Sequence, residues 1–191
     1  MRVISGTARG KRLKAPRGTD TRPITDMIKE ALFNVIGDNI VGASLLDLFA
    51  GSGSVGIEAL SRGAQMVIFI DNHIKSVNTI RENLSNCGFK EDYELYRNDV
   101  FRALEILRQR QIKFDYIYAD PPFTVPGIFS PFLAAMDDYS SLLTNEGNLI
   151  LRSPRKMGLT VELNQLEEYR SDNYGESTLH YYCLNKEVIR G

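Results

Sequence analysis

The sequence predicts an α/β fold, a doubly wound and mostly parallel sheet with helices on both faces. Three observations support this prediction: apolar strand-like segments alternate with helical ones, a glycine-rich turn follows the first strand, and a short polar turn follows the fourth. The 191 residues are 43% hydrophobic and 25% charged, which is ordinary for one globular domain with a substantial core.

The regular alternation begins near Ser44. Strands are predicted at 45–49, 66–70, 93–96, 114–119 and 148–151, and helices at 55–62, 74–86, 100–109 and 129–143. Strands joined through helices pair in parallel, and the crossovers cover both faces of the sheet. The central part of the chain therefore accounts for the doubly wound sheet.

The N-terminal part has a different pattern. Short strand-like runs on either side of the segment 6–10 predict a β-hairpin. A helix is expected from about Asp26, with Thr25 or Asp26 as its cap and Gly37 at its end. The hairpin and the loop after it form an extension over residues 1–25.

The C-terminal part predicts an antiparallel strand pair. Segments 166–170 and 179–184 read as two strands, and Asn173-Tyr174-Gly175 reads as the turn between them. No repeat or linker divides the chain. We therefore expect one domain over 1–191, in which residues 26–191 form the core and 1–25 a basic extension.

Charge is distributed unevenly between the extension and the core. Residues 1–34 contain eight basic and three acidic side chains, so this stretch carries 8 − 3 = +5, while the whole chain carries −1. A basic arm on an acidic body predicts a polyanionic partner, although a merely solvated hairpin is the alternative. The candidates for phosphate contacts are Arg9, Lys11, Arg12 and Arg22.

Composition also bounds the compartment and the chemistry. No stretch approaches the roughly 18 apolar residues that a membrane helix needs, and the start lacks the apolar run of a secretory signal. Cys87 and Cys183 match no metal or disulfide spacing, and His73 and His180 are isolated. We expect a cytoplasmic protein without a metal site.

The glycine turn after the first strand predicts a nucleotide-like cofactor. Gly51, Gly53 and Gly56 satisfy the G-x-G-x-x-G pattern, and Asp71 follows about 20 residues later, as in nicotinamide-dependent oxidoreductases. Against that alternative, 191 residues leave little room for a second nucleotide-binding half. In addition, a carboxylate at Asp47 would repel a pyrophosphate.

S-adenosylmethionine fits these residues better, because it carries an ammonium group, a sulfonium and a ribose but no phosphate. Asp47 suits the ammonium group, Asp71 the ribose hydroxyls, and the segment 98–100 the adenine. Asp71 and Asp99 are also plausible helix caps after strands. The predicted cofactor-binding residues are Asp47, Phe49, Ala50, Gly51, Ser52, Gly53, Asp71, Asn98, Asp99, Val100 and Asp120.

The polar turn after the fourth strand predicts the chemistry. A strand's carboxyl end is where open α/β sheets bind ligands, and two prolines stiffen the turn. A carboxylate, a fixed carbonyl and an aromatic ring then face one point, which suits the exocyclic amine of a flat base. The predicted catalytic residues are Asp120, Pro121, Pro122 and Phe123.

Together these motifs resemble the class I methyltransferases, Rossmann-like enzymes that use S-adenosylmethionine, and among them those that modify nucleobase amines. The segment 22–34, Arg-Pro-Ile-Thr-Asp-Met-Ile-Lys-Glu-Ala-Leu-Phe-Asn, is similar to a signature of the RsmD-type bacterial enzymes. Segments 46–53, 58–64, 120–123 and 174–177 also match, so the resemblance covers essentially the whole chain.

The resemblance implies methyl transfer to the N2 amine of a guanine in 16S rRNA, either as naked RNA or in the small ribosomal subunit. We expect a monomer, the default for an enzyme that approaches a large particle. An adenine-N6 methyltransferase is the alternative, because the Asp-Pro-Pro-Phe motif is shared with such enzymes. The chain departs from the family pattern at His73 and at Arg152–Arg155, where acidic residues are common. We expect the second departure to alter the rim of the active site or to add phosphate contacts.

Overall fold

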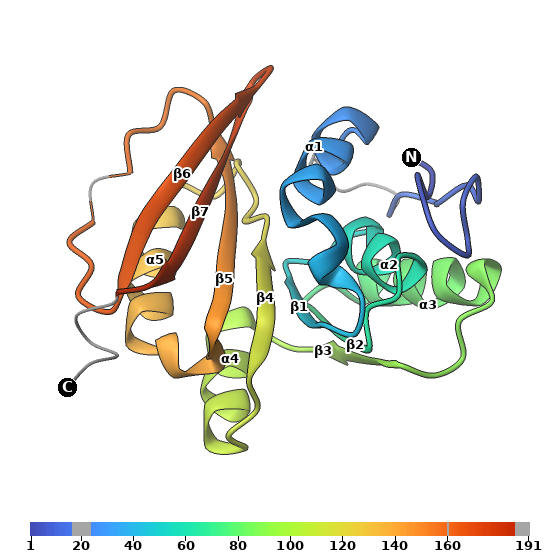
Figure 1. The fold of residues 1–191 in the computed structure, drawn as a ribbon, viewed down its shortest axis with the longest axis horizontal. Helices are drawn as coiled ribbons and strands as arrows, with labels where there is room; N and C mark the ends of the chain where they lie inside the picture. Colours follow the sequence, from blue (N-terminus) through green and yellow to red (C-terminus); the bar gives the residue numbers. More distant parts are fainter. Residues whose placement is uncertain (17–23, 160, 186–191) are drawn as a thin grey trace.

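A seven-stranded sheet forms the centre of the computed structural model, which describes residues 1–16, 24–159 and 161–185 (Figure 1). The strand order is β3-β2-β1-β4-β5-β7-β6, and only the pairings of β7 with β5 and β6 are antiparallel. The strands are β1 Ser44–Leu48, β2 Met66–Asp71, β3 Tyr93–Arg97, β4 Phe114–Ala119, β5 Leu143–Pro154, β6 Leu166–Tyr174 and β7 Ser177–Leu184. The predicted fold class is confirmed.

The strand order reverses between β1 and β4. The chain proceeds outward from β1 through β2 to β3, and then returns to the other side of β1 for β4 and β5. In open α/β sheets, ligands bind outside the carboxyl ends of the strands at such a reversal. The topology therefore points to the turns that follow β1 and β4.

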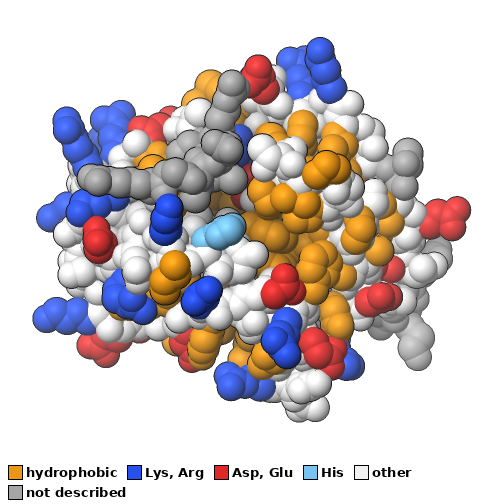
Figure 2. Space-filling model, turned by 180° about the vertical axis from the view of Figure 1, so that it is seen from behind, with side chains coloured by type: hydrophobic (Ala, Val, Ile, Leu, Met, Phe, Trp, Pro, Cys, Tyr) orange, Lys and Arg blue, Asp and Glu red, His pale blue; other side chains and the backbone are white. Residues whose placement is uncertain are grey.

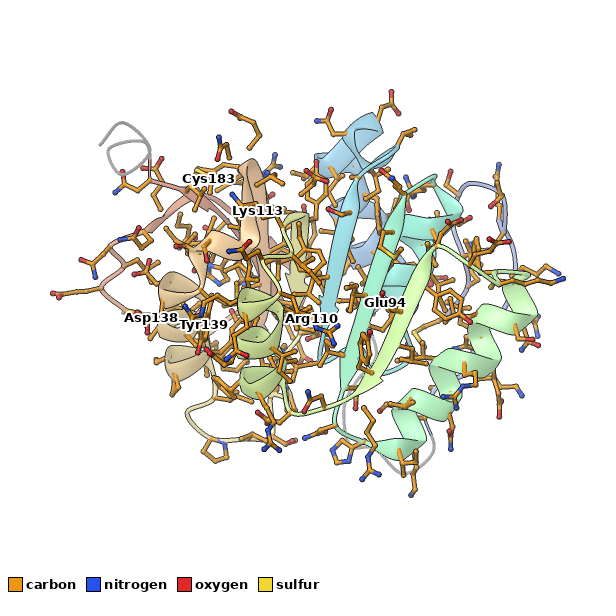
Figure 3. All side chains as sticks on the ribbon, turned by 90° about the horizontal axis from the view of Figure 1, so that it is seen from below. Glu94, Arg110, Lys113, Asp138, Tyr139 and Cys183 are labelled. Atoms are coloured by element: carbon orange, nitrogen blue, oxygen red, sulfur yellow. The ribbon has the colours of Figure 1, made fainter. Side chains whose placement is uncertain are left out.

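In the described part of the chain, five α-helices cover the two faces of the sheet. They are α1 Asp26–Ile36, α2 Ser54–Ser61, α3 Ile74–Cys87, α4 Val100–Gln109 and α5 Phe129–Asp138. Buried side chains of α1, α2 and α3 share one apolar cluster, and those of α4 and α5 share the other. Figure 3 shows Tyr139, just after α5, beside α4, where its hydroxyl donates to Glu105 at 2.9 Å. None of the described helices is long and apolar enough to cross a membrane.

The first helix has the boundaries that its sequence predicts. The Thr25 hydroxyl accepts a hydrogen bond from the Ile28 N–H at 3.3 Å and so caps α1. Gly37 ends the helix with φ of 62°, a conformation that favours glycine. The apolar face of α1 is buried against the sheet.

The predicted helix over 129–143 is too long. α5 ends at Asp138, a short 3-10 turn covers Ser140–Leu142, and β5 starts at Leu143 rather than near 148. Near the end of α5, the Asp137 carboxylate accepts hydrogen bonds from the backbone N–H groups of Asn164, Gln165 and Leu166. The end of α5 thereby holds the chain that enters β6.

The N-terminal hairpin is present only in reduced form. Its single β-bridge joins Arg2 to Arg12, supported by a hydrogen bond from the Val3 N–H to the Lys11 carbonyl at 2.9 Å. The loop lies tightly on the end of α2: a Cβ on Gly6 would be 1.6 Å from the Ser61 carbonyl oxygen. The extension is thus packed onto the core.

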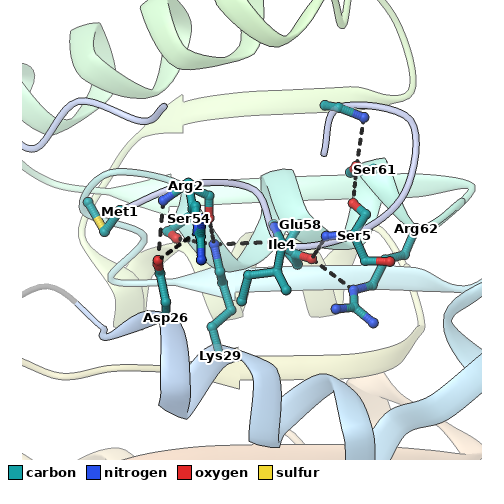
Figure 4. A network of polar contacts seen from close by, with 12 residues as sticks. Met1, Arg2, Ile4, Ser5, Asp26, Lys29, Ser54, Glu58, Ser61 and Arg62 are labelled. Carbon is teal, nitrogen blue, oxygen red and sulfur yellow. Dashed lines mark hydrogen bonds and ion pairs between the residues drawn. The ribbon is translucent and has the colours of Figure 1, made fainter. Parts of the chain in front are cut away.

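A buried ion pair holds this loop in place (Figure 4). Glu58 accepts hydrogen bonds from the N–H groups of Ile4 and Ser5 at 2.8 and 2.9 Å, and from Arg62 Nε at 2.9 Å. Lys29 Nζ lies 3.3 Å from the same carboxylate, and the two side chains are 1% and 0% exposed. We call Lys29, Glu58 and their partners the N-terminal clamp.

Candidate active site

The turns after β1, β2, β3 and β4 meet at one edge of the sheet. The Ala50 N–H donates to the Ile70 carbonyl at 3.1 Å, and the Asp120 N–H donates to the Leu48 carbonyl at 3.4 Å. On the outer side, the Asn98 N–H donates to the Asp71 carbonyl at 3.1 Å. The structure therefore brings the predicted cofactor residues and the predicted catalytic turn to the same place.

The glycine turn has the close geometry that its glycines predict. Gly51 and Gly53 have φ of 57° and 73°, and the Gly53 N–H donates to the Ala50 carbonyl at 2.7 Å. Gly56 serves a different purpose, because a Cβ there would be 2.3 Å from the Phe69 ring. The third glycine thus allows α2 to pack closely on β2.

Asp47 is 2% exposed and lies behind the glycine turn. Its Oδ2 accepts a hydrogen bond from the Gly56 N–H at 2.9 Å. Burial raises the pKa of Asp47 well above its usual value, and the nearby carboxylates of Asp120 and Asp71 raise it further. The sequence predicted a ligand role here, and the structure adds a structural role at the start of α2.

Asp71 and Asp120 therefore lie close enough to Asp47 to influence its ionisation. A bound cation would favour the ionised form of such carboxylates, whereas a phosphate would oppose it. This arrangement favours a positively charged cofactor over a dinucleotide. The residues present suit the ammonium and sulfonium of S-adenosylmethionine.

Asp71 and Asp99 both organise the backbone of the site. Asp71 Oδ2 accepts from the Gly51 N–H and Oδ1 from the His73 N–H, both at 2.8 Å. Each carboxylate oxygen can accept more than one hydrogen bond, so Asp71 retains acceptor capacity for a ribose hydroxyl. Asp99 caps α4 by accepting from the Arg102 N–H at 3.1 Å. Their ligand roles stay predictions.

The Asp-Pro-Pro-Phe turn exposes an aromatic ring beside a partly buried carboxylate. The Phe123 side chain is 40% exposed, and its ring centroid lies 5.9 Å from that of Phe129. The Val125 N–H donates to the Pro122 carbonyl at 3.1 Å, which closes the turn. The side chain of Asp120 keeps 20% of its surface accessible.

Arg152 contacts the predicted catalytic turn, and sequence analysis missed these contacts. Its Nη1 donates to Asp120 Oδ2 at 2.8 Å, its Nε donates to Ser177 Oγ at 3.1 Å, and its Cζ lies 5.0 Å from the Phe123 centroid. At 5% exposure it is part of the wall of the site rather than a surface contact for phosphate. A period of two places it on the same face as buried Ile150, which was a usable signal.

The ion pair opposes the effect of burial on Asp120. Burial raises the pKa of Asp120, whereas the charge and hydrogen bond of Arg152 lower it. Tyr118, also buried on this face, has a pKa well above its usual value, because burial disfavours the phenolate. Arg152 is thus the cation that favours an ionised Asp120.

Three of the residues predicted to contact phosphates lie on the exposed N-terminal loop. Arg9, Lys11 and Arg12 are exposed, and no ion pair is recorded for them within the described residues, whereas Arg22 lies outside those residues. The formal charge overstates the basic surface, because Lys29 is buried in the clamp. Figure 2 shows many Lys and Arg side chains on the half of the molecule with the N-terminal loop and α3, and hydrophobic side chains gathered in a central hollow.

Within the described ranges, no group of three or more His, Cys, Asp or Glu side chains could hold a metal ion. Cys87 and Cys183 form no disulfide with each other. Burial raises the pKa of the Cys87 thiol, which disfavours the reactive thiolate.

Comparisons with known proteins were made with the whole chain. The family described as "Conserved hypothetical protein 95" matches residues 1–183. The "Putative rRNA methyltransferase YlbH" of Bacillus subtilis is 40% identical over 182 residues, which cover 95% of this chain and 98% of the relative. "Ribosomal RNA small subunit methyltransferase D" of Escherichia coli is 32% identical over 165 residues, covering 86% and 80%.

A solved structure agrees with these sequence matches. The "Putative methyltransferase yhhF" of Escherichia coli superposes with a TM-score of 0.82 at 28% identity, and the match covers 97% of this chain and 98% of that chain. Such coverage includes the N-terminal loop and the C-terminal strand pair as well as the central sheet. The similarity thus extends over the complete architecture described above.

Proposed function

The chain belongs to the family described as "Conserved hypothetical protein 95", and from this premise we propose that it methylates the N2 amine of a guanine in small-subunit rRNA. The resemblance to the RsmD-type enzymes and the prediction of an rRNA methyltransferase that uses S-adenosylmethionine are confirmed. One observation carries the choice of a base amine as acceptor: Asp120 lies beside exposed Phe123 at the sheet's reversal point, next to the glycine turn.

Residues at the carboxyl edge of the sheet are proposed to hold the cofactor. Asp47, among the three carboxylates, suits the ammonium group, and Asp71 suits the ribose hydroxyls. The segment 98–100, which follows β3, is proposed to border the adenine. When bound, S-adenosylmethionine supplies an electrophilic methyl group on a sulfonium.

The catalytic turn is proposed to orient the amine of the base. The lone pair of the guanine amine is delocalised into the ring, so the amine is a weak nucleophile. The Asp120 carboxylate and the Pro121 carbonyl accept hydrogen bonds from the two N–H groups of the amine. These hydrogen bonds favour a geometry in which the nitrogen lone pair points at the methyl group. The rate then comes mainly from alignment and from preorganised charge, and no strong base is required.

Phe123 is proposed to stack on the target base and to hold its plane. A base that starts paired or stacked must first be flipped out, which costs a few kcal/mol. An exposed ring next to the acceptor carboxylate offsets part of that cost by stacking. Pro122 keeps the ring and the carboxylate in a fixed relation.

The N-terminal loop is proposed to bind the RNA backbone. Arg9, Lys11 and Arg12 present three exposed cations on a loop that the clamp holds against α2, and Arg22 is proposed to join them. Such contacts neutralise phosphates and make the affinity depend on salt. We propose 16S rRNA in the cytoplasm as the substrate and a monomer as the active form.

Labelled methyl transfer tests the proposal. Small ribosomal subunits from a strain that lacks the enzyme are incubated with the protein and labelled S-adenosylmethionine, and the nucleosides of the product are analysed. The proposal expects N2-methylguanosine at a single site. N6-methyladenosine would leave the catalytic turn in its role but overturn the substrate, and no label in the subunits despite measurable binding of S-adenosylmethionine would overturn the rRNA assignment.

A further inference from the structure

Arg152 joins three parts of the molecule that sequence analysis treated separately. It contacts Asp120 and Phe123, the two ends of the catalytic turn, and it donates to Ser177 at the start of β7. Ser177 closes the segment 174–177, a family signature to which the proposed reaction gives no role. One guanidinium therefore connects the catalytic turn to the C-terminal strand pair.

Burial of this arginine calls for an explanation. Its neighbours Ile150 and Leu151 are apolar and almost wholly buried, as is usual for a central strand. A buried charge is costly unless it is well paired, and an apolar side chain at the same place is often no less stable. Stability alone therefore does not explain a buried arginine at this position, and we consider instead its effect on Asp120.

We propose that Arg152 is a positioning residue for methyl transfer, which holds Asp120 in one orientation and one charge state and packs against one face of Phe123. The inference rests on the proposed function, because it assigns Asp120 to the amine of the base. Arg152 itself does not contact the reacting atoms. It acts through the carboxylate and the aromatic ring that do.

The geometry divides the work between the two carboxylate oxygens. Arg152 Nη1 binds Oδ2 of Asp120, and no hydrogen bond to Oδ1 is recorded within the described residues. With one oxygen fixed, the plane of the carboxylate is set, and Oδ1 is directed as an acceptor for an N–H of the base. A charge-assisted hydrogen bond of 2.8 Å suits this task.

The same guanidinium orders the stacking surface. Arg152 Cζ lies over the Phe123 ring at 5.0 Å from its centroid, within the range of a cation–π contact. One face of the ring is thereby occupied, while 40% of the side chain stays exposed for a base. Removal of Arg152 would free both the ring and the carboxylate.

The C-terminal strand pair supports Arg152 from behind. Ser177 Oγ accepts from Arg152 Nε at 3.1 Å, and the Arg155 N–H donates to the Glu176 carbonyl at 2.8 Å. The turn between β6 and β7 thus holds both ends of the segment 152–155. This contact gives the signature at 174–177 a role in shaping the active site.

Two variants test the inference, Arg152→Met and Arg152→Lys. We expect Arg152→Met to lower kcat about 100-fold at saturating RNA and cofactor, the size of effect produced by a misplaced catalytic group. Binding of S-adenosylmethionine, measured by calorimetry, stays within about twofold. Arg152→Lys keeps the charge without the fork-shaped guanidinium, and its kcat falls less, by about tenfold.

The pH dependence of kcat separates positioning from mere structural support. The titratable groups that face Asp120 are Arg152 from β5, Tyr118 from β4 and Asp47 from β1. Arg152 alone among them is cationic, so its loss raises the pKa of Asp120. Because the carboxylate is the active form, the acid limb of the profile moves to higher pH in Arg152→Met and stays close to wild type in Arg152→Lys.

Arg155→Met is the matched control, since Arg155 is exposed, lies three residues further on, and keeps its backbone hydrogen bond to Glu176. Its acid limb is expected to coincide with that of wild type. The double variant Asp120→Asn/Arg152→Met is expected to be slower than Asp120→Asn alone by much less than 100-fold, because only the contact of Arg152 with Phe123 remains to be lost. A full additional loss in the double variant would mean that Arg152 acts independently of Asp120 and would overturn the inference.

Two further outcomes would overturn the inference: a wild-type kcat and pH profile in Arg152→Met, or a faster variant, which would mean that the guanidinium blocks the site. A carbon NMR titration of the labelled Asp120 carboxyl, assigned with Asp120→Asn, gives a readout that needs no RNA. If wild type fails to methylate small subunits, the proposed function fails. A raised Asp120 pKa in Arg152→Met would still support the ion pair's effect, and an unchanged pKa would contradict it.

Discussion

Two buried ion pairs lie on the same face of the sheet, and they differ in how completely they are satisfied. In the clamp, Glu58 accepts from two backbone N–H groups and Arg62 as well as pairing with Lys29, and neither member is exposed. At the active site, Asp120 has Arg152 as its one recorded partner within the described residues and keeps a fifth of its side chain accessible. A saturated pair fixes structure, whereas an unsaturated one has capacity left for a substrate.

The largest effect on stability is expected at the saturated pair. Lys29→Met removes the buried cation beside Glu58 and leaves the less buried Arg62 as the remaining one. Breaking a buried pair by removing one partner typically costs about 3–5 kcal/mol. For a chain of this size the Tm falls by about 2–4 °C for each kcal/mol. Scanning calorimetry measures the change, with Lys14→Met in the exposed pair with Glu82 as the control. An unchanged Tm in Lys29→Met would show that the clamp holds nothing together.

The largest effect on catalysis is expected at the unsaturated pair. Asp120→Ala removes the acceptor for the amine, and kcat should fall by about 10²–10³-fold, as when one preorganised partner of the transition state is deleted. Cofactor affinity stays largely intact. The control is Asp138→Ala, an exposed carboxylate at the end of α5 (Figure 3). Methylation by Asp120→Ala at a rate near wild type would remove Asp120 from the mechanism.

Asp47 is expected to affect both stability and cofactor binding, and its substitution should separate the two effects. Since burial raises the folded pKa of Asp47, its stabilising form is the protonated one, and that contribution is lost as pH rises through the folded pKa. Asp47→Asn cannot ionise and can still accept from Gly56, so at pH 7 the Tm should rise, by about 2–4 °C for 1 kcal/mol.

The same substitution should weaken the binding of S-adenosylmethionine about 10–100-fold, because a hydrogen bond to a charged group is lost. Calorimetry on one preparation of Asp47→Asn gives both the Tm and the affinity. Unchanged affinity would exclude Asp47 as the ammonium partner and leave it with the structural role at Gly56 alone.

The smallest effect is expected on the exposed loop. Replacing Arg9, Lys11 and Arg12 with Gln should weaken RNA binding and reduce the slope of log K against log salt by about 0.7–0.9 for each lost phosphate contact. The control replaces Arg110 and Lys113, which lie between α4 and β4 (Figure 3). Helix α4 covers the other face of the sheet from the N-terminal loop. Equal slopes in the loop variant and wild type would make the loop a structural element.

Sequence periodicity was sufficient to predict the elements of the central sheet. β4 and α4 have the predicted bounds, and most other ends differ by one or two residues, because alternating burial and capping residues act locally. β5 was the main failure among the strands. The polar residues Thr144, Asn145 and Glu146 look like a turn in sequence, but in the structure they belong to β5 and lie in an irregularity between Leu143, which pairs with Phe114, and Asn148, which pairs with Tyr116.

The sequence predicted the glycines and carboxylates of the candidate site, but it did not predict the ion pairs that hold them in place. Glycines and carboxylates that follow predicted parallel strands can be assigned to one site, because the carboxyl ends of these strands meet at the same edge of the sheet. The pairs Asp120–Arg152 and Lys29–Glu58 join residues about thirty positions apart and from different elements, and no local rule predicts which charges meet. Arg152 was noted in the sequence as an unusual cation, but the sequence did not show that its partner is Asp120.

Helix α2 has a further consequence. It starts at Gly53 in the glycine turn and ends at Ser61, whose carbonyl accepts the Thr7 N–H of the N-terminal loop at 2.8 Å. Eight residues of helix, about 12 Å, thus separate the proposed cofactor and RNA contacts. If the cofactor changes the affinity for RNA by some factor, then RNA changes the affinity for the cofactor by the same factor, because linkage is reciprocal. The ternary complex therefore reaches the same free energy by either order of binding.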